Sequence, residues 1–511
     1  MKSTKSWWFA AVSAAFLALP FGAVQAAPPR YGGALHVKLR AASVSLDPRE
    51  WMPGSPAAAD AGKLASLVYD RLVTLDDYGK FQPALATEWT HDASGKNWQF
   101  KLRLAVHFSD GSVLTPGDVL AALQATLGPG FEITGTENAV NVHAARPAPD
   151  LLEQLASGRN FVFRAQPDGT LLGTGPFFVA DVVAAAPTEA NPAAVKAARM
   201  KFQANENCWA GRPFVDVVEV TLGEPALRQL FDLQVGKADI AEIAPDLVRK
   251  GRQEGLRIWS SAPRTLVALK FDDALTAPAS DDLREALWLA LDRDTMANVL
   301  LQREAQPATN LLPQWLTGYA FLFESPMNLQ RAKGLRADFS TGVVGAAQSL
   351  RLRVDAQGDL FKLVGERVAV NARQANLWVQ LAMPSGANAS TAAVGLRLFA
   401  WHYDSLSPRA ELEAFVKQIA QGGDLPASAT DPEQLFAQER RLLEERRILP
   451  LVFLPEYVGV RATVHNWNAS AWGDWRLADV WLEPEGAGSA KTAGGAQKDN
   501  STTARNPGAR P

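Results

Sequence analysis

The sequence contains one cysteine, Cys208, among 511 residues, so an internal disulfide is excluded even in an oxidising compartment. Stability must come from the size of the core instead, and hydrophobic residues make up 47% of the chain. A nucleophilic cysteine needs a histidine and a third polar partner in a recognisable pattern, and none accompanies Cys208. We expect this side chain to be a buried or partly buried small hydrophobe.

Histidine is scarce and basic residues are dispersed. The 6 histidines show no His-x-x-x-His spacing, so the sequence predicts neither a metal site nor a cofactor held by the chain alone. A net charge of -3, without a run of lysine and arginine, argues against nucleic acid as a partner. No Gly-x-Ser-x-Gly, His-Glu-x-x-His or Ser-x-x-Lys set with its partners stands out, which argues against a secreted enzyme.

Residues 1–26 have the three parts of a secretory signal peptide. Lys2 and Lys5 form a positive start, residues 7–21 are apolar, and residues 24–26 form a small-residue cleavage site. The apolar part is short for a membrane span, so an uncleaved anchor is the weaker alternative. No cysteine lies at the cleavage site, which argues against a lipid anchor. We therefore expect cleavage after Ala26 and a periplasmic protein.

Residues 98–120 combine a strand, a tight turn and the start of a helix. Apolar and polar residues alternate from Trp98 to Leu104, which is the period of a strand with one buried face. Asp110-Gly111 is a turn dipeptide. Thr115 suits the N-cap of a helix that begins at Pro116 and continues to about Leu127.

The run Phe100-x-Leu102-Arg103 … Val106-x-Phe108-x-Asp110-Gly111 … Leu114-Thr115-x-x-Asp118-Val119 resembles the signature of family 5 extracellular solute-binding proteins. These are the peptide- and nickel-type binding proteins of ABC importers. Further landmarks that resemble the family lie along residues 31–482, and the match fades at 128–145 and 318–400. The clearest of them are Gly173-Thr174-Gly175-Pro176-Phe177, the segment 205–220 and Arg284-x-Ala286 … Ala290-Leu291-Asp292-Arg293 … Met296.

The resemblance implies an α/β fold of the two-lobed periplasmic-binding-protein type (type II), with an extra N-terminal subdomain and a ligand cleft between the lobes. Beyond residue 484, glycine, alanine, serine and threonine dominate, as in disordered tails. The implied order is a signal peptide (1–26), the first segment of lobe I (27–58), a small N-terminal subdomain (59–172), the second segment of lobe I (173–262), lobe II (263–454), a return to lobe I (455–484) and a disordered tail (485–511).

The candidate ligand-binding residues are Asp404, Trp401, His402 and Trp209. Peptide-binding members of the family carry Trp-x-x-Asp with proline four residues later, and their aspartate binds the ligand's α-amino group. Trp401, Asp404 and Pro408 match that pattern, and a desolvated carboxylate suits an ammonium ion. The alternative is that Asp404 caps a turn. His402 is a candidate contact for a chelated metal, and Trp209 either faces the ligand or packs in the core.

Three helices are expected to matter for packing. Residues 63–75 have helical apolar spacing. Residues 280–301 are expected to form a helix with Arg284 and Arg293 on a salt-bridged surface. Residues 431–447 are expected to form an amphipathic helix with Glu439 on its solvated face.

The resemblance therefore predicts a periplasmic solute-binding protein, not an enzyme, that binds a di- or oligopeptide and delivers it to an ABC permease in the inner membrane. Such proteins are mostly monomers that close around their ligand. The alternatives are the same fold binding a nickel chelate or a sugar, a non-transport sensor with a degenerate cleft, and a secreted hydrolase.

Overall fold

A computed structural model describes residues 28–76, 78–184, 186–188, 191–196, 198–275, 280–319, 323–324, 326–341, 350–356, 358–382, 395–420, 431–470 and 473–483. The predicted signal peptide and tail lie outside these residues. Within them, no helix is both long and apolar enough to cross a membrane.

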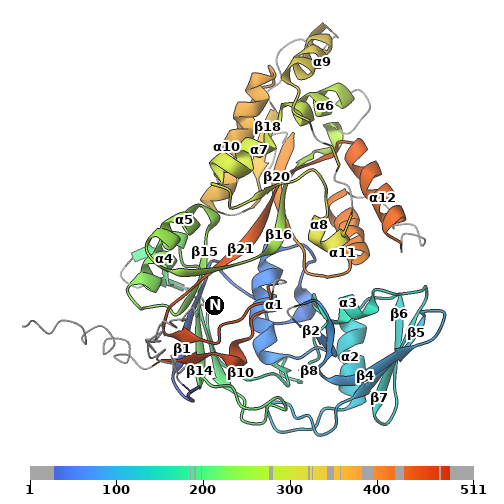
Figure 1. Cartoon of the computed structure of the whole chain (residues 1–511), viewed down its shortest axis with the longest axis vertical. Coiled ribbons are helices and arrows are strands. Elements are labelled where there is room, and N and C mark those ends of the chain that lie inside the picture. The colour runs from blue at the N-terminus through green and yellow to red at the C-terminus, as the bar shows by residue number, and fades with distance from the viewer. Residues whose placement is uncertain are drawn as a thin grey trace, which may run out of the picture.

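One large sheet of 11 strands connects the two lobes (Figure 1). β17 (Gln306–Pro307) pairs with β21 at the side of the sheet. The other strands, in spatial order, are β10 (Phe177–Val183), β13 (Arg199–Ala204), β14 (Val217–Leu222), β1 (Ala34–Leu39), β15 (Ile240–Ile243), β21 (Ile448–Val460), β16 (Arg257–Phe271), β20 (Leu396–His402), β18 (Leu350–Val354) and β19 (Val379–Leu381).

β16 and β21 are 15 and 13 residues long and pass from one lobe into the other as an antiparallel pair. The lobe I end of β21 pairs with β15, and the lobe II end of β16 pairs with β20. Between these ends the register shifts on both sides of Pro263, which has no N–H to donate. There the Ser261 hydroxyl accepts the N–H of Glu456 at 2.9 Å.

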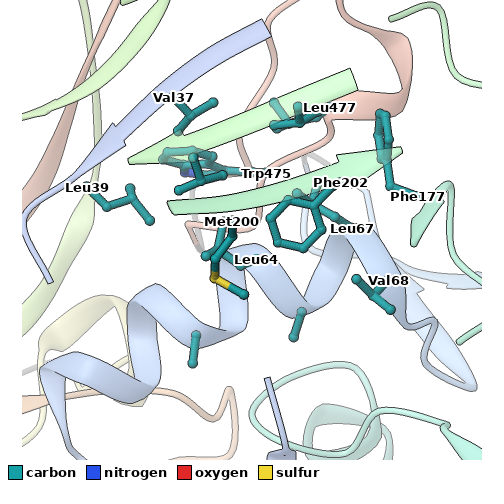
Figure 2. Packing of buried hydrophobic residues seen from close by; sticks show 14 of the residues in the cluster. Val37, Leu39, Leu64, Leu67, Val68, Phe177, Met200, Phe202, Trp475 and Leu477 are labelled. Carbon is teal, nitrogen blue, oxygen red and sulfur yellow. The ribbon is translucent and has the colours of Figure 1, made fainter. Parts of the chain in front are cut away.

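The lobe I core lies between this sheet and α1 (Pro56–Val68), with α4 (Ala226–Gln234) and α5 (Pro245–Gln253) on another part of the sheet. Figure 2 shows Leu64, Leu67 and Val68 of α1 facing the strands. The predicted helix over 63–75 is shifted: α1 ends at Val68 because Tyr69 is extended, and residues 73–75 form β2 (Val73–Leu75). The apolar spacing did not separate the helix from the strand that follows it.

The Gly-Thr-Gly-Pro turn packs against the end of α1. A Cβ added to Gly173 would stand 1.8 Å from the Val68 carbonyl oxygen, and one added to Gly175 would stand 2.7 Å from the Val68 carbonyl carbon. The Gly175 N–H donates to the same carbonyl oxygen at 2.9 Å. The turn therefore needs glycine for a close approach of two backbone segments.

The small subdomain is built on a four-stranded antiparallel sheet packed against α2 (Pro116–Thr126). The predicted cap of α2 is present, because Asp118 N–H donates to the Thr115 hydroxyl and Thr115 N–H donates to the Asp118 carboxylate. The apolar cluster of this subdomain begins at Leu72, whereas α1 packs in lobe I. We therefore propose that the subdomain starts after α1 and not at residue 59. Its sheet order is β4 (Ala86–His91), β5 (Asn97–Leu102), β7 (Ala139–Ala144) and β6 (Phe131–Gly135).

Short elements complete this part of the chain. They are α3 (Leu151–Leu155) and the two-stranded pairs β2 with β3 (Phe81–Pro83), β8 (Arg164–Ala165) with β9 (Leu171–Leu172), β11 (Ala186–Thr188) with β12 (Asn191–Lys196), and β22 (Val464–His465) with β23 (Trp481–Leu482).

Lobe II buries both faces of its sheet. Val267, Leu269 and Phe271 of β16 belong to one apolar cluster, whereas Leu266 and Ala268 belong to another on the opposite face. The continuous apolar run of β16 follows from this arrangement. The helices of this lobe are α6 (Asp281–Ala290), α7 (Arg293–Thr295), α8 (Gln314–Thr317), α9 (Leu329–Thr341), α10 (Asp359–Gln374), α11 (Pro408–Phe415) and α12 (Pro432–Glu444).

Three charged residues of lobe II, Arg284, Arg293 and Glu439, are buried and do not lie on the helix surfaces predicted for them. Arg284 does form a salt bridge, with Asp281. Arg293 donates to the Pro450 carbonyl at 2.7 Å, and Arg284 donates to the Leu275 carbonyl at 2.7 Å. The Glu439 carboxylate accepts hydrogen bonds from the backbone N–H groups of Leu311 and Leu312. The predicted helix over 280–301 is also broken, because Leu291 is extended between α6 and α7. Helical spacing alone did not show that other segments of lobe II cover the helix faces that carry these charged residues.

Candidate functional site

A cavity of about 180 Å³ lies where lobe I, the small subdomain and lobe II meet. Its walls come from segments that are far apart in the sequence. They are residues 51–53, α1, Arg71, residues 126–127, residues 154–160, Arg264 of β16, residues 402–414, Glu456 of β21 and residues 473–474.

Asp404 lines this cavity from the loop between β20 and α11. Its backbone is fixed, because the carbonyl accepts the N–H of Gly158 at 2.8 Å and its own N–H donates to Glu411 at 2.8 Å. Among the residues that the structure describes, its carboxylate accepts one hydrogen bond, a long one from the Gly54 N–H at 3.4 Å. Burial raises the pKa of Asp404 to about 7, against the opposing field of Arg264. The carboxylate is therefore desolvated and poorly compensated.

Glu411 of α11 holds the Asp404 loop in place. It accepts the N–H groups of Asp404 and Ser405, and its second oxygen lies 3.4 Å from the Trp401 indole nitrogen. Burial and the neighbouring Asp404 raise the pKa of Glu411 to about 8. No sequence pattern distinguishes Glu411 from the many other charged residues on helices of this chain.

His402 lies next to Asp404 and also lines the cavity. Its Nδ1 lies 3.1 Å from the Thr265 hydroxyl. Its Nε2 lies 3.8 Å from Asp404 and 4.0 Å from Glu456, which is too far for a hydrogen bond. None of the described residues forms a hydrogen bond with this nitrogen. Burial, together with the charge of Arg264, holds the pKa of His402 well below its usual range, so the imidazole is neutral.

The two candidate tryptophans lie outside the cavity lining. Trp401 is buried behind it, packed edge-on against Phe415 at 5.1 Å. Trp209 packs on the small subdomain, where its indole N–H donates to Asp70 at 2.8 Å and Arg103 lies 4.4 Å from its ring. The structure thus brings Asp404 and His402 together in the cavity, with Trp401 one layer behind and Trp209 elsewhere.

Cys208, the neighbour of Trp209, is half-buried, and burial raises the pKa of its thiol to about 11. This environment fits the expected small hydrophobe, because a reactive thiol requires a lowered pKa.

Lys63 is a buried cation in the cavity wall that the sequence analysis did not single out. Its ammonium lies 2.9 Å from Asp60, 3.0 Å from Glu242 and 3.2 Å from Glu456. Burial opposes its charge, but these three carboxylates hold the pKa of Lys63 well above its usual range. The sequence does contain a sign of this buried charge, because Lys63 interrupts the apolar face of a helix that otherwise packs in the core.

Three arginines also line the cavity. Arg71 lies 3.6 Å from Asp474 and donates to the Gly158 carbonyl at 3.1 Å. Arg264 donates twice to the Tyr403 carbonyl. Arg159 donates to the Thr126 carbonyl at 3.2 Å, and no carboxylate among the described residues lies within ion-pair distance of it. The cavity thus offers both anionic and cationic groups to a ligand.

Comparison with known proteins identifies the family. Residues 80–422 match the model of the bacterial extracellular solute-binding proteins, family 5. The chain belongs to this family. Family 5 proteins are the solute-binding components of ABC importers, they bind peptides or other small ligands, and they lie in the periplasm or outside the cell.

Individual relatives are distant. The chain is 24% identical over 290 residues to a probable di/tripeptide-binding protein 5 of Pseudomonas aeruginosa, a match that covers 50% of this chain and 55% of the relative. The chain thus spans about half the length of this relative.

Solved structures confirm the predicted two-lobed fold. DppA from Helicobacter pylori, in complex with the peptide STSA, has a TM-score of 0.71 at 17% identity over 89% of this chain and 99% of DppA. NikA from Staphylococcus aureus, in complex with Ni(L-His)2, has a TM-score of 0.68 at 17% identity over 88% of this chain and 100% of NikA. Identities this low show the fold alone.

Proposed function

We propose that this protein binds short peptides in the cavity between its lobes and passes them, chemically unchanged, to an ABC permease. It would act as a periplasmic monomer. The observation that carries the proposal is the Asp404 carboxylate, which is desolvated, lines the cavity and has one long hydrogen bond. An α-ammonium group would add a positive charge and hydrogen-bond donors at close range, where Gly54 supplies one long hydrogen bond.

The opposite end of the peptide has a candidate partner in Arg159. Its guanidinium lines the same cavity and donates to the carbonyl groups of Thr126 and Trp51, without a carboxylate at ion-pair distance among the described residues. A guanidinium binds a carboxylate through two parallel hydrogen bonds. A ligand with one positive and one negative end therefore suits the cavity, and the name of the Pseudomonas relative and the peptide bound to DppA support this class.

Thermal unfolding in the presence of candidate solutes tests the proposal. A peptide at 100 times its dissociation constant stabilises the native state by about 2.7 kcal/mol, which is readily measured. We expect a shift with di- or tripeptides that Asp404→Asn abolishes. Glu413→Gln is the control, because Glu413 lies on α11, the helix that follows the Asp404 loop, but outside the cavity lining. A peptide shift that survives Asp404→Asn would contradict the amine site, and no shift with any peptide would contradict the peptide class.

His402 favours a second candidate, a nickel chelate. A neutral imidazole is a good ligand for nickel, and Nε2 of His402 has no close partner among the described residues. The NikA structure contains nickel bound by histidine. No group of three His, Cys, Asp or Glu residues in the described part of the chain forms a metal site, so the metal would arrive with its own chelator. A shift with nickel and L-histidine that His402→Gln abolishes, without any peptide shift, would favour this candidate.

A further inference from the structure

The helical walls of the cavity carry small side chains on both lobes. α1 contributes Ala58, Ala59 and Gly62 from lobe I, and α11 contributes Ala410 and Ala414 from lobe II. Small residues on two helices that line one cavity leave room that larger apolar residues would fill.

Gly62 is the most informative of these residues. It lies inside α1, where glycine weakens a helix relative to alanine. A Cβ added to Gly62 would have no atom within 4 Å, in contrast to Gly173, whose Cβ would overlap the backbone of Val68. Packing of this chain therefore does not require glycine at position 62. The free space above Gly62 belongs to the cavity that Gly62 lines.

An independent polar feature indicates that a ligand occupies this space. His402 is 2% exposed, lines the same cavity, and directs Nε2 toward Asp404 and Glu456 without a close hydrogen-bond partner among the described residues. Apolar surface lies in the same cavity, from Trp51, Leu127 and Leu406. The cavity thus combines a polar end with an apolar space.

We propose that the space above Gly62 is a subsite for a bulky apolar side chain on the first residue of the bound peptide. This inference rests on the proposed function and deepens it, because Asp404 would bind the amine and the same residue would place its side chain against α1. The protein would then prefer peptides that begin with leucine or phenylalanine over peptides that begin with glycine.

Calorimetry with Phe-Gly-Gly, Leu-Gly-Gly and Gly-Gly-Gly tests the subsite. We expect wild-type protein to bind the first two at least tenfold more tightly than Gly-Gly-Gly. Gly62→Leu should weaken Phe-Gly-Gly and Leu-Gly-Gly at least tenfold and leave Gly-Gly-Gly within twofold. Gly334→Leu is the matched control, because Gly334 is also helical with nothing within 4 Å but lies on α9, outside the cavity lining.

Each other outcome overturns a defined part of the proposal. Equal affinity for the three peptides, or an equal loss for all three in Gly62→Leu, would overturn the subsite and leave the peptide function intact. Absence of any peptide binding in wild type would overturn the proposed function itself. Where Gly62→Leu fails to fold, Gly62→Ala should fold and weaken Phe-Gly-Gly relative to Gly-Gly-Gly at least threefold. An unchanged ratio would overturn the subsite.

Discussion

Gly54 of lobe I lies directly on the indole ring of Trp401 of lobe II. A Cβ added to Gly54 would stand 2.3 Å from the ring, and the backbone of Gly54 has a φ of +76°. The Gly54 carbonyl also accepts the N–H of His402 at 2.8 Å, and its N–H donates to Asp404. Gly54 is thus one of the contacts between the lobes beside the candidate site, and Trp401 takes part in this contact without lining the cavity.

We expect Gly54→Ala to force the lobes apart at this contact, because neither the φ angle nor the space accommodates a methyl group. Peptide affinity should fall at least tenfold, and small-angle scattering should show a larger radius of gyration with peptide present. Gly95→Ala is the control, since Gly95 has a φ of +64° and nothing within 4 Å. Equal effects of the two substitutions would show that backbone strain, and not the contact with Trp401, is responsible.

Peptide affinity should depend on pH through Asp404. The pKa of Asp404 is raised to about 7 by burial, so in the free protein its carboxyl is protonated at lower pH. An ammonium group requires the ionised form, and affinity should therefore fall up to about tenfold for each pH unit below 7. Arg264, Glu456 and Arg71 act on the same carboxyl.

Calorimetry from pH 5.5 to 8 measures this dependence. Asp404→Asn should bind weakly with a flat profile. A wild-type profile that is also flat would mean that the amine binds elsewhere.

Removal of the Lys63 charge should destabilise the fold strongly at alkaline pH. Lys63→Met would leave Asp60, Glu242 and Glu456 close together without their shared cation, and breaking one partner of a buried ion pair typically costs about 3–5 kcal/mol. Part of this loss should return at pH 5.5, where the carboxylates protonate more readily, and in the double variant with Glu242→Gln.

Urea unfolding at pH 8 and pH 5.5 measures both effects. Lys101→Met is the control, because Lys101 is exposed and pairs with Glu88 at 3.6 Å, an interaction worth about 0–1 kcal/mol. A similar small loss in both variants would show that the buried cluster does not depend on Lys63.

Glu439→Gln should stabilise the protein at pH 8. Burial raises the pKa of Glu439 to about 7, although the N–H groups of Leu312 and Leu311 oppose the shift. A carboxyl whose pKa is higher in the folded state stabilises the fold at low pH and loses that contribution as pH rises through 7. Glutamine keeps an acceptor oxygen for both N–H groups without the charge.

The gain should approach about 3 kcal/mol at pH 8 as an upper bound and vanish near pH 4.5. Urea unfolding at these two pH values measures it. A loss of stability at pH 8 would mean that the charged form is well compensated.

Local signals in the sequence predicted local structure correctly. Thr115 and Asp118 form the expected helix cap, and Trp98, Phe100 and Leu102 lie on the buried face of β5, as their alternation with polar residues predicts. Charged residues with distant partners could not be assigned this way. Glu439 accepts hydrogen bonds from residues 127 and 128 positions away in the chain, Leu312 and Leu311. One partner of Lys63, Glu242, lies 179 positions away. Their environments depend on the tertiary fold, which helical periodicity does not contain.

The same limit applies to the candidate site. A family resemblance led to Asp404 and His402, which the structure places in one cavity. It did not lead to Arg159 or Gly62, because an arginine in a loop and a glycine in a helix have no distinctive pattern around them. Only the tertiary structure shows that both residues line the cavity.

The position of β21 in the sheet has a consequence for biosynthesis. β21 lies between β15 and β16, so lobe I cannot complete its sheet until residues 457–460 are available. A ribosome must therefore synthesise most of the chain before either lobe closes its core. Premature folding is thereby delayed, which is consistent with the signal peptide predicted for residues 1–26, because export requires an extended polypeptide.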